Sequence, residues 1–500
     1  MFHSIDEQTI IAQCTPRGSG AIALLRISGI NALEIASSIS KLPSNKPLCD
    51  VASHTIHYGA VIEPYGTVVD QVLFMVMQAP RTFTGQNTVE ITCHNNQFII
   101  EQIIALAIAN GARLAQEGEF TKRAVLNGKI DLVQAEAINE LIHAQTQMAL
   151  KQSLAQLHGS LSSWLISIEQ ELLKALALSE ASFEFLDEEM EFAPQINAMI
   201  AHVMSTITEI KKTYNQQQQI RQGIRVALIG SVNAGKSSLF NALLNQNRAI
   251  VTAIAGTTRD AIEAGVYKNG NYWTLVDTAG LRQTDDMIEQ EGIRRSFEEA
   301  HKADIIILAY DSSREITAEE NMVYQEIAEK YPNKIITVYT KVDNALNTFL
   351  DSSSKISESL ETNGKKSAQK NYSHSATDKQ KSHISPFVSS EHLCESRNAV
   401  PVSSKTKVNI DILEHAIEQK ITTLFADIES PFLLNQRQYN LLLTLESKLA
   451  EIKTMLENPV AYELLSIHLN DAIADLAQLS GKAISEAGMD KVFREFCIGK

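Results

Sequence analysis

The sequence contains few cysteines and no closely spaced pair of them. Its five cysteines are Cys14, Cys49, Cys93, Cys394 and Cys497. None belongs to a Cys-x-x-Cys motif, and the spacing is typical neither of a disulfide framework nor of a zinc site. We therefore expect a protein of a reducing compartment, the cytoplasm.

Long hydrophobic runs and an excess of positive charge are also missing. No apolar run approaches the ~18 residues of a membrane-spanning helix, and the first ten residues, with Asp6 and Glu7, do not resemble a secretory signal. The 500 residues include 59 acidic and 44 basic side chains, a formal net charge of −15. This balance argues against non-specific coating of nucleic acid, which needs many lysines and arginines. We expect no association with membranes.

What is present is typical of globular domains. Hydrophobic residues make up 44% and charged residues 21% of the chain, so we expect packed cores. The length suggests about three domains of ~150 residues. Residues 1–125 alternate short β-like runs with glycine and proline, which predicts a small α+β domain. These runs are Ala21–Ile27, Val68–Met77 and Val89–Thr92.

Two stretches, residues 126–221 and 426–500, have the pattern of amphipathic helices. In the first, large apolar residues recur at spacings of three and four, which predicts a buried helix-packing seam. They are Leu150, Leu154, Leu157, Leu161, Trp164, Ile168 and Leu172. In the second, one face carries Leu441, Leu442, Leu445, Leu449 and Ile452. We expect one discontinuous helical domain, interrupted by a module at residues 222–425.

Part of that module, about residues 345–398, has an unusual composition. Of the 40 residues 351–390, 12 are serine, 6 are lysine and only six are large and apolar. Such a segment buries too little surface to offset the entropy of ordering it. We predict a disordered surface loop.

The strongest chemical signal is a phosphate-binding loop. Residues 230–237, Gly-Ser-Val-Asn-Ala-Gly-Lys-Ser, match the GxxxxGK[ST] motif and lie between the strand-like run Ile224–Ile229 and a helical run. In this motif backbone N–H groups surround the phosphates, Lys236 reaches the terminal phosphates and the Ser237 hydroxyl binds Mg²⁺. Two further segments, Ala255–Asp260 and Asp277–Gly280, have the order of the two switches of a P-loop nucleotidase.

The element that selects the base is expected after the run Ile335–Tyr339, at Thr340-Lys341-Val342-Asp343. Asp343 can accept hydrogen bonds from N1–H and the exocyclic amine of guanine, which favours GTP. The motif usually begins with asparagine, and Thr340 lacks the amide that ties the base to the phosphate loop. We expect weaker guanine affinity or selectivity. The backbone of Val402–Lys405 is expected to bind the guanine oxygen.

The residue that positions the attacking water is not evident, because Leu281 replaces the glutamine that many GTPases use. Four downstream acids are candidates, and positive charge could come from Arg259, Arg282 or a cation bound near Asn233. The acids are Asp285, Asp286, Glu289 and Glu291.

Several segments together resemble the MnmE (TrmE) family of tRNA-modifying GTPases over nearly the whole chain. They are the phosphate loop with Asn233, Ile250–Asp260, Asp277–Arg282, Gly118–Ala124, Asp131–Ala137 and the C-terminal Phe496–Lys500. The segment 351–390 departs from the family, which has a compact loop there.

The resemblance implies a tetrahydrofolate-binding α+β domain, a discontinuous helical domain and an inserted Ras-like GTPase domain. It also implies a homodimer that acts with a flavin-containing partner, MnmG or GidA, which carries FAD. Together the family's proteins add an aminomethyl or carboxymethylaminomethyl group to C5 of the wobble uridine of tRNA, with reduced folate as the one-carbon donor.

The resemblance also implies site residues. Mg²⁺ would be held by Ser237 and Thr258, and Glu289 would position the water. A K⁺ ion would be held by Asn233, Thr252 and Ile254, with Thr257 nearby. The implied GTP-binding residues are Asn233, Ala234, Gly235, Lys236, Ser237, Ser238, Thr252, Ala253, Ile254, Ala255, Gly256, Thr257, Thr258, Asp277, Thr278, Ala279, Gly280, Thr340, Lys341 and Asp343.

For folate, the resemblance implies Arg26, Glu90, Lys129 and Lys500. Cations and an acid suit a ligand that carries carboxylates and an amino-pyrimidinone ring. Cys497 has two interpretations, a small buried hydrophobic residue or a catalytic or redox residue.

A second function remains open at this point, a regulatory GTPase that acts in ribosome assembly and does no chemistry on RNA. Residues 118–137 and the C-terminal tail favour the tRNA-modifying enzyme, because a ribosome-assembly switch has no need of a folate pocket.

Overall fold

The computed structural model describes residues 8–184, 192–246, 262–268, 270–277, 288–344, 399–425, 432–457 and 461–499. Its contacts divide the chain into two compact units. The first comprises Met1–Ala144, Ala149–Tyr214 and Ser430–Lys500, and the second comprises Gln145–Met148 and Asn215–Glu429.

The first unit contains a seven-stranded sheet in the order β3-β4-β5-β6-β2-β1-β7. Neighbouring strands are antiparallel except β1 and β7. The strands are β1 (Ile10–Gln13), β2 (Ile22–Ser28), β3 (Ser40–Lys41), β4 (Thr55–Ile62), β5 (Val68–Met77), β6 (Thr88–His94) and β7 (Arg113–Leu114). The three predicted strands are confirmed as β2, β5 and β6.

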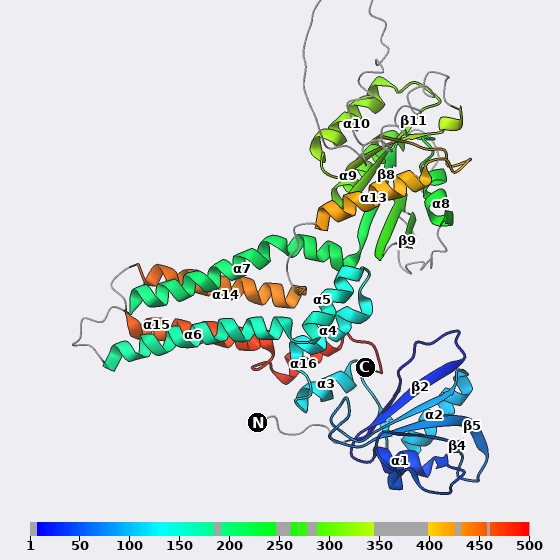
Figure 1. Ribbon diagram of the computed structural model, residues 1–500, viewed down its shortest axis with the longest axis vertical. Coiled ribbons are helices and arrows are strands. Elements are labelled where there is room, and N and C mark those ends of the chain that lie inside the picture. Colours follow the sequence, from blue (N-terminus) through cyan, green and yellow to red (C-terminus); the bar gives the residue numbers. More distant parts are fainter. Residues whose placement is uncertain are drawn as a thin grey trace, which may run out of the picture. The chain divides into compact units, whose positions relative to one another are not determined.

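One face of this sheet is covered by α1 (Ala32–Ser38) and α2 (Gln97–Ala109), which Figure 1 shows beside the strands. A short 3₁₀ turn, Leu48–Asp50, follows β3. Alternate strand residues such as Leu25 and Ile91 pack with Ile35 of α1 and Ile103 of α2 in one core. Because side chains alternate along a strand, Arg26 and Glu90 lie on the opposite face.

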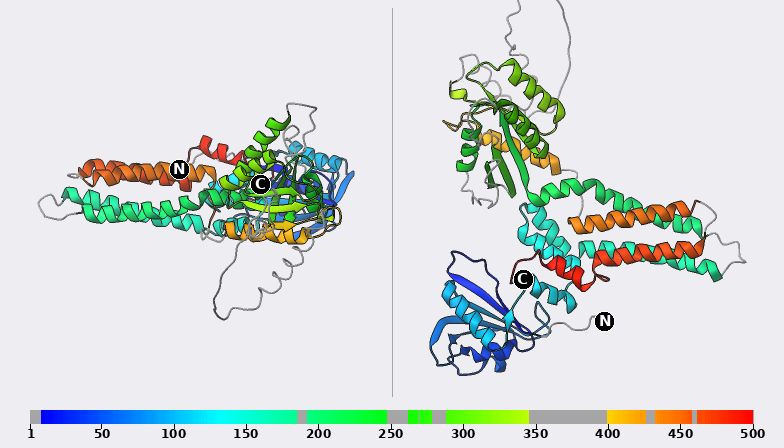
Figure 2. Two further views of the ribbon diagram at one scale, coloured as in Figure 1. Left: turned by 90° about the horizontal axis from the view of Figure 1, so that it is seen from above. Right: turned by 180° about the vertical axis from the view of Figure 1, so that it is seen from behind.

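The helical part of this unit is built around four long helices, α6 (Ser160–Glu184), α7 (Ala193–Gln222), α14 (Gln436–Met455) and α15 (Tyr462–Ser480). They lie side by side in the views of Figures 1 and 2 and share one apolar core, to which α7 contributes up to Tyr214. Shorter helices are α3 (Glu119–Leu126), α4 (Leu132–His143), α5 (Gln147–Leu157) and α16 (Glu486–Phe493). This hydrophobic core thus joins helices that precede the α/β domain in the sequence to helices that follow it.

The predicted apolar seam of residues 150–172 is only half correct. Leu161, Ile168 and Leu172 are buried in α6, whereas Leu150 and Leu154 of α5 are exposed at 48% and 44%. The helix ends at Leu157, and Gly159 adopts φ 95° before α6 begins. This break changes the direction of the chain, so the periodicity does not continue on one face.

The second unit is an α/β domain with a six-stranded sheet in the order β13-β12-β11-β8-β10-β9. All neighbours are parallel except β9 and β10. The strands are β8 (Ile224–Gly230), β9 (Ile262–Lys268), β10 (Asn271–Asp277), β11 (Ile305–Asp311), β12 (Ile335–Thr340) and β13 (Ala399–Pro401).

Helices cover both faces of this second sheet. Residues of α8 (Lys236–Gln246) and α13 (Ile410–Phe425) share a core on one face. Residues of α10 (Ala318–Lys330) and the end of α9 (Ile288–Lys302) pack on the other face. A short 3₁₀ turn, Val342–Asn344, follows β12. The predicted fold class, α+β and α/β parts with a helical domain, is confirmed.

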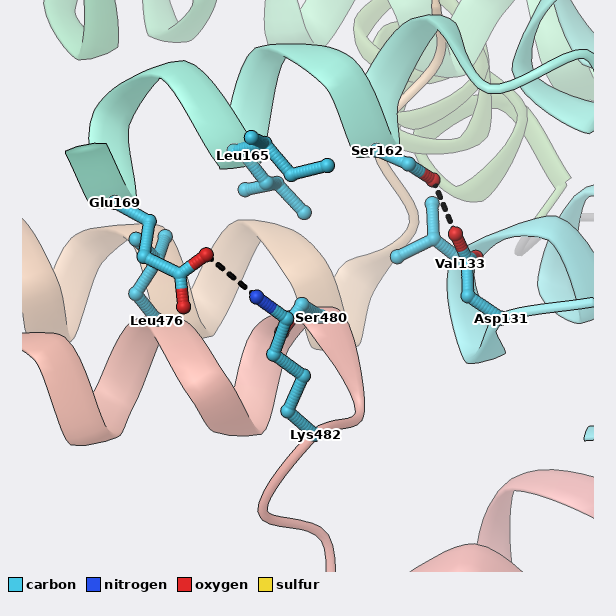
Figure 3. Close-up of a pocket in the computed structure, with 9 residues that line it drawn as sticks. Asp131, Val133, Ser162, Leu165, Glu169, Leu476, Ser480 and Lys482 are labelled. Atoms are coloured by element: carbon cyan, nitrogen blue, oxygen red, sulfur yellow. Dashed lines mark hydrogen bonds and ion pairs between the residues drawn. The ribbon is translucent and has the colours of Figure 1, made fainter. Parts of the chain in front are cut away.

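A small cavity of about 80 Å³ lies among α4, α6 and α15. Figure 3 shows that its polar side chains face one another: Lys482 pairs with Glu169 at 2.5 Å, and Ser162 donates to Asp131 at 2.7 Å. None of the helices in the described ranges is both long and apolar enough to cross a membrane. The predicted disordered segment, residues 345–398, lies outside the described residues.

Candidate functional site

The phosphate loop connects the end of β8 to the start of α8. A Cβ atom on Gly230 would lie 2.6 Å from the Ala309 carbonyl oxygen of β11, so this position requires glycine. Asn233 and Gly235 adopt φ angles of 63° and 85°, which turn the chain back on itself. The loop therefore contains left-handed backbone conformations, which let successive N–H groups point towards an anion at the N-terminus of a helix.

Lys236 lies inside this loop. Its Nζ donates to the carbonyl oxygens of Gly230 and Ser231, both at 2.7 Å, and the residue is only 5% exposed. Burial lowers the pKa of Lys236, and the nearby Asp277 carboxylate opposes this effect. Asp277 ends β10, which pairs with β8, while Ser237 is exposed at the start of α8. The predicted Lys236, Ser237 and Asp277 thus gather at the carboxyl ends of adjacent strands.

Thr340, at the end of β12, connects the base-selecting segment to the phosphate loop. Its hydroxyl lies 2.6 Å from the Ala234 carbonyl oxygen and 3.0 Å from that of Tyr310. The residue is 2% exposed. Although Thr340 lacks the usual amide, its hydroxyl still connects this segment to Ala234 of the phosphate loop, and the expected weaker guanine affinity or selectivity stays a prediction.

Lys341 is fixed beside the phosphate loop by an ion pair of 2.7 Å with Asp311. Burial alone raises the pKa of Asp311, but hydrogen bonds from Lys341 and Ser313 outweigh it and the pKa is lowered. A Cβ atom on Gly235 would lie 3.9 Å from the Lys341 Cε. The lysine stem therefore lies close to the phosphate loop, where it can cover one face of a bound base.

Asp343 accepts a hydrogen bond of 2.7 Å from the Ser403 hydroxyl, which joins the two segments predicted to bind guanine. In the second segment the Val402 N–H donates to Tyr339 and the Ser403 N–H donates to Val408. The candidate donors to the guanine oxygen are therefore the N–H groups of the next two residues, 404 and 405.

Two residues that hold the phosphate loop had no signal in the sequence. Tyr324 of α10 accepts from the Ser231 N–H at 2.6 Å and donates to the Ala309 carbonyl at 3.1 Å. Arg314 donates to the Ser231 hydroxyl at 2.9 Å and pairs with Glu320 at 2.5 Å. The hydrogen bond from Arg314, the largest cause, lowers the pKa of Glu320 to about 2.

Several predicted residues fall outside the described part of the chain. Glu289 lies in the first turn of α9, and the structure describes only its backbone. The residues outside the described ranges are Thr252, Ala253, Ile254, Ala255, Gly256, Thr257, Thr258, Thr278, Ala279, Gly280 and Lys500.

The predicted folate residues Arg26 and Glu90 are partners on the open face of the first sheet. They are opposite each other in the register of β2 and β6, and the Arg26 Nε lies 2.7 Å from the Glu90 carboxylate. The Arg26 guanidinium also lies over the rings of Phe83, at 5.8 Å, and Phe120, at 5.4 Å. This charged pair, with its guanidinium near two aromatic rings, suits a flat, polar ligand.

Of the other two predicted folate residues, Lys129 is held by the loop before β6, and Lys500 lies outside the described residues. Lys129 donates to the Pro80 carbonyl at 2.9 Å, in the loop that carries Phe83. The tail passes close to β1, since a Cβ atom on Gly499 would lie 2.4 Å from the Gln13 carbonyl oxygen. Cys497 is exposed, so its interpretation as a small buried residue is wrong.

Comparison with protein families matches both parts of the first unit. Residues 9–129 match the family model described as "GTP-binding protein TrmE N-terminus", and residues 132–497 match "MnmE helical domain". The second match spans the α/β domain as well.

Full-length relatives agree with these matches. The chain is 35% identical over 501 residues to the tRNA modification GTPase MnmE of Geobacillus thermodenitrificans, covering 98% of this chain and 99% of the relative. It is 32% identical to that of Flavobacterium johnsoniae, with 99% and 100% covered, and 34% identical to that of Bacillus subtilis, with 98% and 100% covered. With the phosphate loop and base-selecting segment in place, these matches show that the chain belongs to the MnmE family of tRNA modification GTPases.

Proposed function

We propose that the protein hydrolyses GTP as part of an enzyme that modifies tRNA. The observation that carries the nucleotide assignment is the direct hydrogen bond from Thr340 to Ala234, which joins base selection and phosphate binding in one site. Asp343, oriented by Ser403, would accept from N1–H and the exocyclic amine of guanine. Adenine does not offer this pair of donors.

Hydrolysis is proposed to depend on two cations and one carboxylate. Ser237 and Thr258 would bind Mg²⁺, while the Asn233 side chain and the backbone carbonyls of Thr252 and Ile254 would bind K⁺. Asn233 suits this role because it is exposed in the phosphate loop. A cation at this position stabilises the negative charge that develops on the phosphates. Glu289, in the first turn of α9, would hold the attacking water.

The tRNA chemistry is proposed to use the open face of the first sheet. Arg26, Glu90, Lys129 and Lys500 would bind a reduced folate, which supplies a one-carbon unit. With a flavin-containing partner, MnmG or GidA, a homodimer of this chain would add a (carboxymethyl)aminomethyl group to C5 of the wobble uridine in the cytoplasm. The Arg26–Glu90 pair, with the Arg26 guanidinium near two aromatic rings, supports a ligand site that a ribosome-assembly switch would not need.

The nucleotide part of this proposal is tested by GTP turnover in K⁺ and in Na⁺ with Mg²⁺ present. We expect faster hydrolysis in K⁺, and Asn233→Ala should remove the difference between the two ions. Glu289→Ala should abolish turnover and leave GTP binding nearly unchanged. Equal rates in both ions would contradict the Asn233 assignment, and lost binding in Glu289→Ala would contradict a role in positioning water.

The tRNA part is tested by mass spectrometry of tRNA nucleosides from a strain that lacks the protein. We expect the modified wobble uridine to disappear and to return with the wild-type chain, but not with Glu289→Ala. Unaltered wobble uridines in the deletion strain would instead support the switch function.

A further inference from the structure

We infer that Thr340 fixes the base-selecting segment to the phosphate loop but donates no hydrogen bond to the purine, so that the first residue of this segment does not recognise N7 of guanine. The inference rests on the proposed function, because it concerns how the same site selects GTP. Guanine is then recognised by its Watson–Crick edge and by contact with its ring faces.

The argument begins with the hydrogens available at this position. A threonine hydroxyl has one donor hydrogen, whereas the amide of asparagine has two. Both neighbours of the Thr340 hydroxyl, the carbonyl oxygens of Ala234 and Tyr310, are acceptors within 3.0 Å. Guanine N7 is also only an acceptor. Whichever carbonyl receives the hydrogen, none remains for N7.

The side chain is also held in this orientation. Thr340 is 2% exposed, and the N–H and hydroxyl of Ser312 both donate to its carbonyl oxygen. The following residue, Lys341, has φ 58° and is held by Asp311. Turning the hydroxyl towards a base would leave the Ala234 carbonyl without this donor, which is costly in a buried site.

The choice of guanine over adenine is therefore made by the groups that contact the Watson–Crick edge of the base. Asp343 is exposed and oriented by the Ser403 hydroxyl, so it can accept from two guanine donors. The backbone N–H groups at positions 404 and 405 are the candidates for the guanine oxygen. These contacts distinguish guanine from adenine without a hydrogen bond from Thr340 to N7.

The test compares the Kd of the full-length protein for GTP and for 7-deaza-GTP, which has a carbon at position 7, with Mg²⁺ present. We expect the two Kd values of the wild-type chain to agree within about twofold. Thr340→Asn adds a second donor hydrogen and should bind GTP about fivefold more tightly than 7-deaza-GTP, the ratio that one neutral hydrogen bond gives.

Two matched variants test the structural half of the inference. Thr340→Val keeps the shape and loses the donor, so both nucleotides should bind about tenfold more weakly, with their ratio unchanged. Thr340→Ser restores the donor and should recover most of the lost affinity.

The outcomes separate this inference from the proposed function. A wild-type protein that binds GTP but prefers it at least fivefold over 7-deaza-GTP would overturn the inference alone, as would Thr340→Val with full affinity. Absence of saturable GTP binding in the wild type would overturn the proposed function, and the inference with it.

Discussion

At the scale of single residues, Glu119 of α3 is a buried acid held by several hydrogen-bond donors. It accepts from Arg113 at 2.7 Å, from Arg123 at 2.8 Å and from the Gln116 N–H at 2.9 Å. The side chains of Glu119 and Arg123 are only 8% and 3% exposed. Burial, the largest single effect, raises the pKa of Glu119, but the hydrogen bonds together lower it below its ordinary value.

Glu119→Gln should therefore destabilise the protein in a pH-dependent way. A carboxylate whose folded pKa is lowered stabilises the fold fully above its ordinary pKa, and this contribution is lost as the pH falls through the folded pKa. At neutral pH we expect a loss of about 3–5 kcal/mol, because the buried Arg123 loses its carboxylate partner and keeps neutral acceptors, Gln86 and the Gln8 carbonyl. Urea unfolding at neutral and acidic pH should show the loss shrinking as the pH falls.

The exposed neighbour Glu117 offers a matched control for this measurement. Glu117→Gln should change the unfolding free energy little at either pH. An equal loss for Glu119→Gln at both pH values would show that the charge of Glu119 does not stabilise the fold.

The sequence predicted individual residues well where a motif fixes the backbone. Lys236 follows β8 and Asp277 ends the neighbouring β10, as the order of the motifs predicted, because the phosphate loop and the strand before the second switch constrain both. Tyr324 could not be predicted, since it reaches Ser231 from a helix 93 residues later. No local pattern distinguishes such a tyrosine from one that only packs.

At the scale of helices and strands, prediction depended on whether the periodicity continued through one element. The strand β5 was found as predicted, and so was the face of α14, with Leu441 partly buried and Leu442, Leu445, Leu449 and Ile452 buried. The predicted seam is found in α6 but not in α5, because α5 buries Gln152, Ser153 and Gln156 in place of leucines. Hydrophobicity alone does not indicate which face of a short helix meets its neighbours.

The start of α4 shows how one polar side chain can fix a helix. Asp131 accepts from the Gln134 N–H at 2.7 Å, and the Gln134 side chain accepts from the Asp131 N–H at 2.9 Å. The second carboxylate oxygen accepts from Ser162 of α6, as Figure 3 shows. The same side chain thus caps α4 and connects it to α6.

Asp131→Ala should weaken α4 more than Asp131→Asn. Loss of the cap costs about 0.5–2 kcal/mol, whereas asparagine is as good an N-cap as aspartate. Hydrogen exchange of the α4 amides should be faster in Asp131→Ala by the corresponding factor, and close to wild type in Asp131→Asn. Equal exchange in both variants would contradict the capping role.

At the scale of the whole molecule, the C-terminal tail returns to the beginning of the chain. Ile498 forms a β-bridge with Glu117, and the Gly118 N–H donates to the Cys497 carbonyl at 3.4 Å. Gly118 has φ 63°, and a Cβ atom there would lie 2.7 Å from the Phe493 carbonyl oxygen. Position 118, which lies against the C-terminal residues, therefore requires glycine.

Removing residues 497–500 should weaken folate binding and leave GTP binding unchanged. The tail belongs to the first unit, whereas the nucleotide site belongs to the second. Titration of one preparation with a reduced folate and with GTP measures both affinities. A parallel loss of GTP affinity would contradict this separation, and unchanged folate affinity would remove the tail from the proposed site.

Finally, Gln145–Met148 lie well before the inserted module in the sequence but belong to the same compact unit as that module. Gln147 donates its N–H to the Gly270 carbonyl at 2.7 Å, at the turn between β9 and β10. An excised G domain that starts at residue 215 would leave this turn unsupported. Protein engineers who want the domain alone could graft this short segment onto it, because the compact unit that holds the nucleotide site is not one contiguous stretch of the chain.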